Sequence, residues 1–272
     1  MNMNLDGKTT VVTGAAGGIG AALARRFHAA GARVVVADRD ADRLNAVAAE
    51  LNALRADSAL AVVADISSEQ GNIDLIEAAR AKFGFINLFF ANAGVAVGTT
   101  LEDTDEATWN MVMNINTHAH RWAAKHLMGE WIAAGEGYFC STASAAGLLS
   151  QIGSGTYSVS KHAAVAFAEW LSITYGDRGI RVTTLCPQGV NTNMLNPPDA
   201  SGIASSGGSA VKASGAVLEP SHVADVVYQH ILEEKFLVMP HPEVHTYEER
   251  KVADRDRWLA GMRRLQAKVS GL

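Results

Sequence analysis

The stretch that decides the fold is Thr13-Gly14-Ala15-Ala16-Gly17-Gly18-Ile19-Gly20, near the start of the chain. It follows the β-branched run 9–13 and opens the segment 19–30, in which Ile19, Leu23 and Phe27 recur at helical spacing. Glycines between a strand and a helix let the backbone turn tightly. They also let a pyrophosphate approach the helix N-terminus, where amide groups and the helix dipole favour negative charge. The stretch therefore predicts a dinucleotide-binding βα unit.

An acidic residue at the end of the second expected strand supports this prediction. Asp38 follows the glycine stretch at the spacing of about 20 residues that is typical of dinucleotide-binding βαβ units. A carboxylate there can accept both hydroxyls of the adenosine ribose but repels a 2′-phosphate. We therefore predict NAD as the cofactor. Arg39 follows at once and could bind that phosphate, whereas the glycine at position 17 supplies no second cation.

The rest of the chain alternates short β-branched runs with helix-patterned segments, which is the rhythm of βαβ units. The expected strands are 9–13, 33–37, 59–64, 86–91, 137–141 and 181–186, with 236–239 as a possible seventh. The expected helices are 19–30, 75–83, 104–131 and 157–175. The pattern predicts an α/β fold, namely a Rossmann-like, doubly wound parallel sheet of about seven strands within three αβα layers.

The chain is long and apolar enough for a large core, with 272 residues of which 48% are hydrophobic. We expect a single dinucleotide-binding and catalytic domain over residues 1–272. Segment 191–215, rich in Asn, Pro, Ser, Ala and Gly, is expected to be a substrate loop because it follows the sixth strand. Residues 241–272 are expected to form a C-terminal extension. It ends in an amphipathic helix with apolar residues Trp258, Met262, Leu265 and Val269.

Charge and composition exclude several classes of partner. A formal net charge of −5 offers no cationic surface for nucleic acid or for an anionic membrane. There is no N-terminal leader pattern, and no apolar run approaches the ~20 residues of a membrane span. Two cysteines cannot build a framework of several disulfides, so a cytoplasmic protein with small-molecule or subunit partners is expected.

Further motifs carry a resemblance to a known family. Asn92-Ala93-Gly94 follows the fourth expected strand, and Tyr157-Ser158-Val159-Ser160-Lys161 places a Tyr and a Lys four residues apart. Ser144 comes shortly before Tyr157, after the fifth expected strand. Together with the pattern Thr-Gly-x-x-x-Gly-x-Gly, these motifs resemble a short-chain dehydrogenase/reductase over roughly residues 6–239.

The resemblance implies a catalytic set formed by Ser144, Tyr157, Lys161 and Asn116. Asn114 competes for the last place, but the distance of Asn116 from Asn92 fits the family spacing better. The resemblance also implies the following cofactor-binding residues: Gly14, Gly18, Ile19, Gly20, Asp38, Arg39, Asp65, Ile66, Asn92, Ala93, Gly94, Tyr157, Lys161, Pro187, Gly189, Val190 and Thr192.

Physical chemistry explains why these residue types belong together. Tyr157 and Lys161 share one helix face, where an ammonium can lower a phenol pKa that starts at about 10. Tyr157 then becomes a usable general acid/base. Ser144 can hydrogen-bond the reacting oxygen and orient it toward the phenol. By resemblance, Lys161 also holds the nicotinamide ribose, and Asn116 holds a water that relays protons.

One segment departs from the family pattern. In Cys186-Pro187-Gln188-Gly189, Gln188 stands where the family usually has glycine. Gly189 could supply the needed turn instead, while Gln188 could contact the substrate together with Ser144 and Tyr157. By resemblance, Thr192 and Val190 contact the nicotinamide carboxamide.

No metal site is expected. The pairs His118 and His120, and His241 and His245, lack a supporting pattern of Cys or carboxylate ligands. Ser158-x-x-Lys161 matches an acylating motif of certain hydrolases, but the partner motifs are absent from the sequence.

The sequence therefore predicts an NAD(H)-dependent oxidoreductase that interconverts a small-molecule secondary alcohol and a ketone. Two alternatives stay open: an NADPH-dependent carbonyl reductase, and a non-catalytic dinucleotide-binding sensor, which has no physical need for all four catalytic residues. A homotetramer is expected by resemblance. It is also favoured because the helix 157–175 carries apolar residues on more than one face.

Overall fold

The computed structural model describes residues 3–98, 100–196 and 215–270, and its centre is a seven-stranded sheet. The strand order is β3-β2-β1-β4-β5-β6-β7, and every neighbouring pair is parallel. The strands are β1 Thr9–Thr13, β2 Arg33–Asp38, β3 Ala59–Val63, β4 Leu88–Ala91, β5 Gly137–Thr142, β6 Ile180–Leu185 and β7 Leu237–Val238. This confirms the predicted doubly wound parallel sheet, including its short seventh strand.

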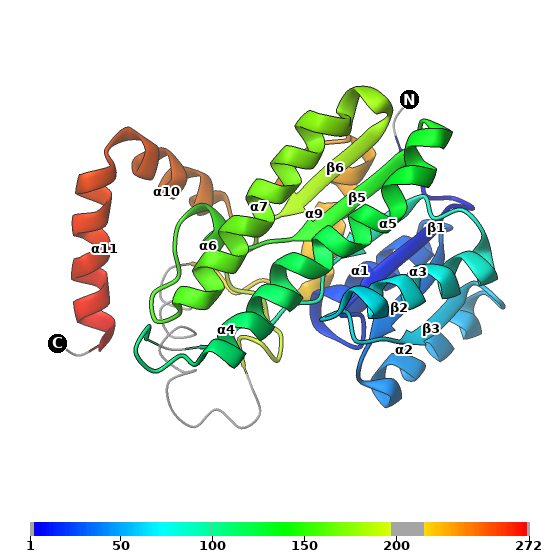
Figure 1. Cartoon of the computed structure of the whole chain (residues 1–272), viewed down its shortest axis with the longest axis horizontal. Coiled ribbons are helices and arrows are strands. Elements are labelled where there is room, and N and C mark those ends of the chain that lie inside the picture. The colour runs from blue at the N-terminus through cyan, green and yellow to red at the C-terminus, as the bar shows by residue number, and fades with distance from the viewer. Residues whose placement is uncertain (1–2, 99, 197–214, 271–272) are drawn as a thin grey trace.

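Helices cover both faces of the sheet, as Figure 1 shows. One face packs against α1 Gly18–Ala29, α2 Ala41–Leu54 and α9 Pro220–Leu232. The other packs against α3 Glu69–Phe83, α5 Ala119–Ala134 and α7 Gly155–Tyr175. Successive strand residues point to opposite cores, so Val12 lies in the first and Val11 in the second. The three predicted layers are therefore present.

The helix expected over 104–131 is interrupted. The structure has α4 Glu106–Met113, a π-helical turn η1 Asn114–His118, and then α5. Such turns insert one extra residue into a helix and often accompany functional sites. Here the turn contains the buried Asn116, whose side chain bonds backbone outside the helix.

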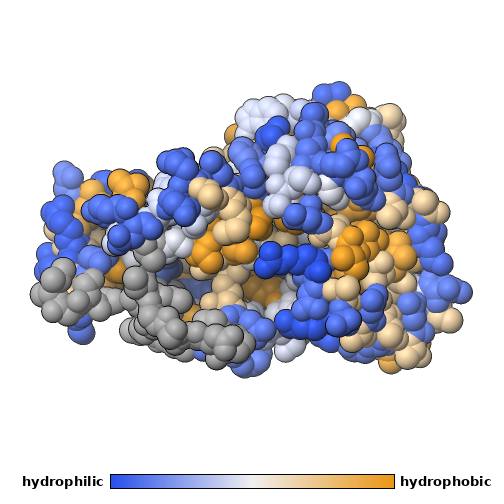
Figure 2. All heavy atoms as spheres, turned by 60° about the horizontal axis from the view of Figure 1, so that its bottom comes forward, coloured by the Kyte–Doolittle hydropathy of each residue, from blue (hydrophilic) through white to orange (hydrophobic). Residues whose placement is uncertain are grey.

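Short elements complete the chain. After β5 comes α6 Ala145–Leu148, and η2 Gly176–Arg178 follows α7. The C-terminal extension forms two helices, α10 Pro242–Ala253 and α11 Arg255–Ser270, and α11 stands away from the sheet (Figure 1). In the view that turns the bottom of Figure 1 forward, the middle of the molecule is hollowed and apolar residues gather around the hollow (Figure 2).

Two expectations from the sequence concern the substrate loop and membrane-spanning helices. Of the expected substrate loop 191–215, residues 197–214 lie outside them. Among the helices within them, none is both long and apolar enough to cross a membrane.

Candidate active site

The carboxyl ends of the parallel strands bring the predicted site residues to one edge of the sheet. The glycine turn 14–18 follows β1, Asp38 ends β2, and Asp65 comes just after β3. The segments 92–94, 143–144 and 186–189 follow β4, β5 and β6. In an open parallel sheet this edge, where the strand order reverses beside β1, is where ligands bind.

The glycine turn has the form that a pyrophosphate cradle requires. Gly14 has φ +67°, and a Cβ built there would lie 2.8 Å from Ala93 Cα. A Cβ on Gly20 would overlap the carbonyl oxygen of Gly14, so neither position tolerates a side chain. α1 begins after Gly17 without a side-chain cap, which leaves its first amide groups available to an anion. The cradle therefore fits a dinucleotide.

Asn92 ties the ends of three strands together. Its Nδ2 donates to the carbonyl oxygen of Thr13 at 2.9 Å, and its Oδ1 accepts from Thr142 Oγ1 at 2.9 Å. The amides of Asn92 and Ala93 both donate to Thr13 Oγ1, at 2.9 and 3.0 Å. Asn92 thus holds β1, β4 and β5 in register around the cradle.

The two acidic residues that the sequence predicts for the adenosine side lie at the end of β2 and just after β3. Asp38 accepts from the amides of Ala16 at 3.2 Å and Arg39 at 2.8 Å, so its carboxylate is fixed beside the glycine turn. Hydrogen bonds from Ser67 hold the pKa of Asp65 below its usual value, and the charge of Arg39 lowers it further. Arg39 is itself exposed.

Arg43 is a cation at this side that the sequence analysis missed. A Cβ built on Gly17 would overlap Arg43 Nη2, so the guanidinium lies directly against the glycine turn. Arg43 also lies 3.9 Å from Asp40. Position 17 supplies no cation, but α2 supplies one at the same place.

Ser144 and Tyr157 face each other from two elements. Ser144 caps the N-terminus of α6, where its Oγ accepts from the amide of Ala146 at 3.1 Å. Tyr157 lies in the first turn of α7, which Ser154 caps. Interaction with Ser144 acts to lower the pKa of the Tyr157 hydroxyl.

The pKa of Tyr157 differs from the sequence expectation. From the sequence, the Lys161 ammonium was expected to lower the pKa of Tyr157. In the structure burial raises the pKa of Tyr157, and the interaction with Ser144 only partly offsets this rise. The isolated protein therefore holds a neutral phenol at this position.

Lys161 lies one helical turn beyond Tyr157, with its Nζ 5.8 Å from the centre of the tyrosine ring. The side chain is only 2% exposed, and Nζ donates to the carbonyl oxygen of Thr142 at 2.7 Å. Burial lowers the pKa of Lys161 to about 8. This ammonium can therefore lose a proton close to neutral pH.

Asn116 lies on the same side of Gly94 as Lys161. Asn116 is fully buried, and its amide exchanges two hydrogen bonds of 2.9 Å with the backbone of Val95. A Cβ built on Gly94 would lie 3.3 Å from both Asn116 Oδ1 and Lys161 Nζ. Asn116 and Lys161 thus converge on the glycine of the Asn-Ala-Gly motif.

The segment after β6 lies across the glycine turn. A Cβ built on Gly18 would lie 3.1 Å from Thr192 Cγ2, so Thr192 borders the cradle. Gly189 is not among the described residues with a positive φ, so the turn there needs no left-handed glycine. The Gln188 side chain extends toward Gly215, whose added Cβ would lie 2.8 Å from Gln188 Oε1.

Two of the histidines considered as metal ligands, His120 and His241, have buried side chains. His120 is buried, and burial lowers its pKa to about 3. His241 bonds backbone atoms through both ring nitrogens. The described residues contain no group of three or more His, Cys, Asp or Glu side chains that could hold a metal ion.

Comparison with known proteins agrees with this geometry. The family model for short chain dehydrogenases matches residues 8–201. The chain is 38% identical over 196 residues to 1-deoxy-11-beta-hydroxypentalenate dehydrogenase of Streptomyces exfoliatus, covering 71% of each chain. It is 32% identical over 194 residues to meso-2,3-butanediol dehydrogenase of Serratia marcescens, covering 71% of this chain and 76% of the relative.

A solved structure extends the likeness to nearly the whole chain. The structure of a short chain dehydrogenase/reductase from Burkholderia phymatum in complex with NAD is similar with a TM-score of 0.86 and 27% identity. The match covers 93% of this chain and 96% of that one. The chain is therefore an oxidoreductase that belongs to the short-chain dehydrogenase/reductase family.

Proposed function

We propose that this protein uses NAD(H) to interconvert a secondary alcohol and a ketone, with Tyr157 as the general acid/base. The observation that supports this most is the convergence of Ser144, Tyr157, Lys161 and Asn116 beside the glycine turn. A cofactor sensor would need the turn and the acidic residues, but no tyrosine one helical turn before a buried lysine. These four residues and the glycine turn belong to one sheet and its helices, which supports a single catalytic domain.

The protein's own residues supply the proton chemistry. Because burial raises the pKa of Tyr157, its hydroxyl is protonated at neutral pH and ready to donate to a carbonyl oxygen. In the opposite direction the phenolate accepts the alcohol proton. Ser144 orients the reacting oxygen, and Lys161 with Asn116 forms the start of a proton path away from Tyr157. A dinucleotide held at the glycine turn would supply the hydride acceptor or donor.

A panel of alcohols tests the proposed reaction. The relatives are named as dehydrogenases of a hydroxypentalenate and of a butanediol, so the panel should include terpenoid alcohols and vicinal diols beside steroid alcohols. With NAD present, we expect the absorbance of NADH to appear with at least one secondary alcohol. Binding of NAD without turnover of any alcohol or ketone would favour the sensor.

The first quantitative prediction concerns cofactor choice. Asp38 lies where it would repel a 2′-phosphate, so kcat/KM should favour NAD over NADP at least tenfold, or about 1.4 kcal/mol. Arg43 against Gly17, with Arg39 nearby, is the observation that favours the NADPH-dependent alternative. Steady-state kinetics with both cofactors will decide between them.

Two variants sharpen that comparison. Arg43→Gln should weaken the use of NADP more than the use of NAD, because a 2′-phosphate adds charge that the guanidinium beside Gly17 can bind. Asp38→Asn should reduce the preference for NAD. Equal or better use of NADP by the unchanged protein would make the carbonyl reductase the better proposal.

The second quantitative prediction concerns assembly. We propose a homotetramer, because α7 leaves Trp170 52% and Ile173 83% exposed, although the sheet covers another face of this helix. Light scattering at micromolar concentration should give a mass near four chains. A strictly monomeric mass would contradict the proposal, and truncation after Asp254 tests whether α11 contributes to assembly.

The proposed setting is the cytoplasm. Cys140 and Cys186 are buried free thiols, which suits the reducing compartment expected from the sequence.

A further inference from the structure

The C-terminal extension contacts the candidate active site through His241, a buried residue between β7 and α10. The short strand β7 pairs with β6, and the amide of Cys186 donates to the carbonyl oxygen of Val238 at 2.8 Å. This pairing places the residues after β7 beside those after β6. The sequence carries no local signal of the contact, because the two segments lie far apart along the chain.

His241 makes two hydrogen bonds to successive backbone units. The amide of Gln188 donates to its Nδ1 at 3.1 Å, and its Nε2 donates to the carbonyl oxygen of Gly189 at 3.0 Å. A backbone amide can only donate and a carbonyl can only accept. The ring is therefore the neutral tautomer with hydrogen on Nε2, and both of its nitrogens are used.

The backbone of Gln188 and Gly189, which His241 bonds, lies between Ser144 and the glycine turn. The carbonyl oxygen of Pro187 accepts from the amide of Ala145 at 2.9 Å and from Ser144 Oγ at 3.4 Å. On the other side, Thr192 packs against Gly18. A shift of residues 187–190 would therefore reach Ser144 through the carbonyl oxygen of Pro187.

At its other end α10 holds a second segment through Lys251. This side chain is 8% exposed, and its Nζ donates to the carbonyl oxygens of Leu148 at 2.5 Å and Leu149 at 2.8 Å. These carbonyls end the short helix α6, which Ser144 begins. Lys251 therefore holds the C-terminal end of α6, the helix whose N-terminus Ser144 caps.

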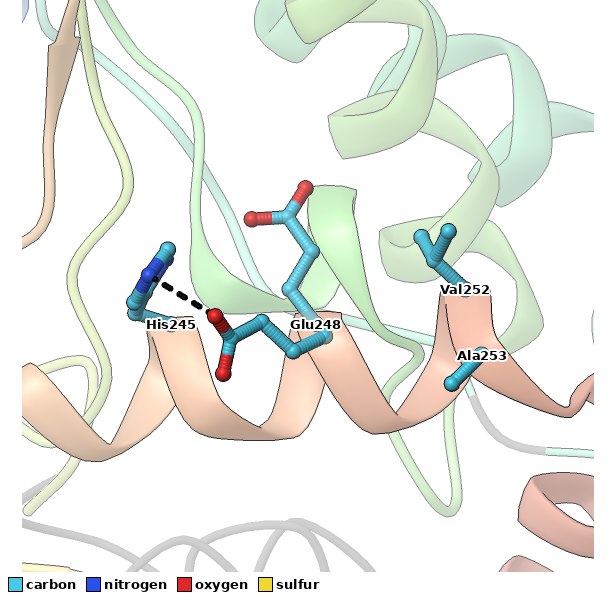
Figure 3. A pocket seen from close by; sticks show the side chains of 5 residues that line it. His245, Glu248, Val252 and Ala253 are labelled. Carbon is cyan, nitrogen blue, oxygen red and sulfur yellow. Dashed lines mark ion pairs between the residues drawn. The ribbon is translucent and has the colours of Figure 1, made fainter.

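A shallow depression beside α10 offers a matched comparison. It has a volume of about 420 Å³ and is lined by His245, Glu248, Glu249, Val252 and Ala253. Figure 3 shows these side chains. His245 has a side chain that is 62% exposed and pairs with Glu249 at 3.3 Å (Figure 3). None of the candidate catalytic residues lines this depression, so His245 is a control residue on the same helix.

We infer that α10 is a positioning element for the reaction, with His241 setting the backbone 187–190 and Lys251 setting the turn at Ser144. His241 and Lys251 are positioning residues because they act through Gln188, Gly189 and α6, and touch no reacting atom. The inference rests on the proposed function, since the segment 187–190 matters to turnover only if it borders the nicotinamide.

The main test compares His241→Phe with His245→Phe. Loss of both bonds should lower kcat about tenfold or more and weaken NAD binding severalfold, because small displacements near reacting atoms are costly. Binding of ADP-ribose, which lacks the nicotinamide, should change less than about twofold. His245→Phe should match the unchanged protein in all three measurements.

Conservative variants keep the test independent of a general folding defect. His241→Asn retains an acceptor for the Gln188 amide, and His241→Gln retains a donor for the Gly189 carbonyl. Both should recover part of the kcat lost in His241→Phe. Lys251→Met should raise the KM for the alcohol, because it removes the bonds to the end of α6 and the 3.4 Å contact with His162 Nε2 on α7.

Amide hydrogen exchange separates this inference from the proposed function. Exchange at the amides of residues 188–190 should rise in His241→Phe and stay unchanged in His245→Phe, whether or not the protein turns over any alcohol. Unchanged exchange there, or equal losses of ADP-ribose and NAD binding, would overturn the positioning role. Absence of activity in the unchanged protein, with the exchange result as expected, would overturn only the proposed function.

Discussion

Replacing Tyr157 by Phe should lower kcat by at least about a thousandfold while the affinity for NAD stays within a fewfold of its original value. Only the phenolic oxygen is removed, and the aromatic ring on α7 is kept. General acid/base catalysis alone contributes about 10²–10⁴ in rate, and the hydrogen bond to the reacting oxygen is lost at the same time. Steady-state kinetics measures kcat, and isothermal titration calorimetry with NAD measures the affinity.

Tyr175→Phe is the matched control, because Tyr175 ends the same helix. Its ring packs edge-on against Trp170, with centroids 5.7 Å apart, at the opposite end of α7 from Tyr157. This substitution should leave kcat unchanged. A Tyr157→Phe enzyme that keeps most of its kcat would exclude Tyr157 as the proton-transfer group.

Lys161→Met should reduce both kcat and cofactor affinity, in contrast to Tyr157→Phe. Methionine has a similar length, so the buried site keeps its packing but loses the ammonium that bonds the carbonyl oxygen of Thr142. We expect kcat to fall about a hundredfold or more, because the proton path beyond Tyr157 is broken. The Kd for NAD should rise about tenfold, since a charged hydrogen bond to the ribose would be lost.

Lys125→Met is the matched control for Lys161→Met. Lys125 is exposed on α5 and pairs with Glu69 at 2.8 Å, so its loss should affect neither quantity. A Lys161→Met enzyme that binds NAD normally would remove the proposed contact with the ribose. Normal turnover as well would remove Lys161 from the mechanism.

The fold could be predicted largely because its signals are local. The glycine turn, the β-branched runs and Asp38 each lie within a short window, and parallel strands need no pairing signal beyond this rhythm. The helix α2 also carries a local signal, with Leu44, Val47 and Leu51 on one buried face, yet the sequence analysis did not assign it. Nor did it assign α9. The break in the helix 104–131 depends on contacts between Asn116 and Val95, which periodicity does not reveal.

The candidate catalytic residues could be predicted from their spacing along the chain, whereas the residues that surround them could not. Arg43 reaches Gly17 from α2, with α1 and β2 between them along the chain, and His241 reaches Gln188 from beyond β7. Neither contact leaves a motif in the sequence. The raised pKa of Tyr157 also comes from burial, which depends on how α6 and α7 pack around the hydroxyl.

Transfer of deuterium tests the central claim most directly. The alcohol that gives the fastest NADH formation is prepared with deuterium on its carbinol carbon and incubated with the protein and NAD. Mass spectrometry of the cofactor should then find one deuterium in the nicotinamide ring of NADH, and the Tyr157→Phe protein should form almost none. Unlabelled NADH, or no NADH from any secondary alcohol, would contradict an NAD-dependent alcohol dehydrogenase.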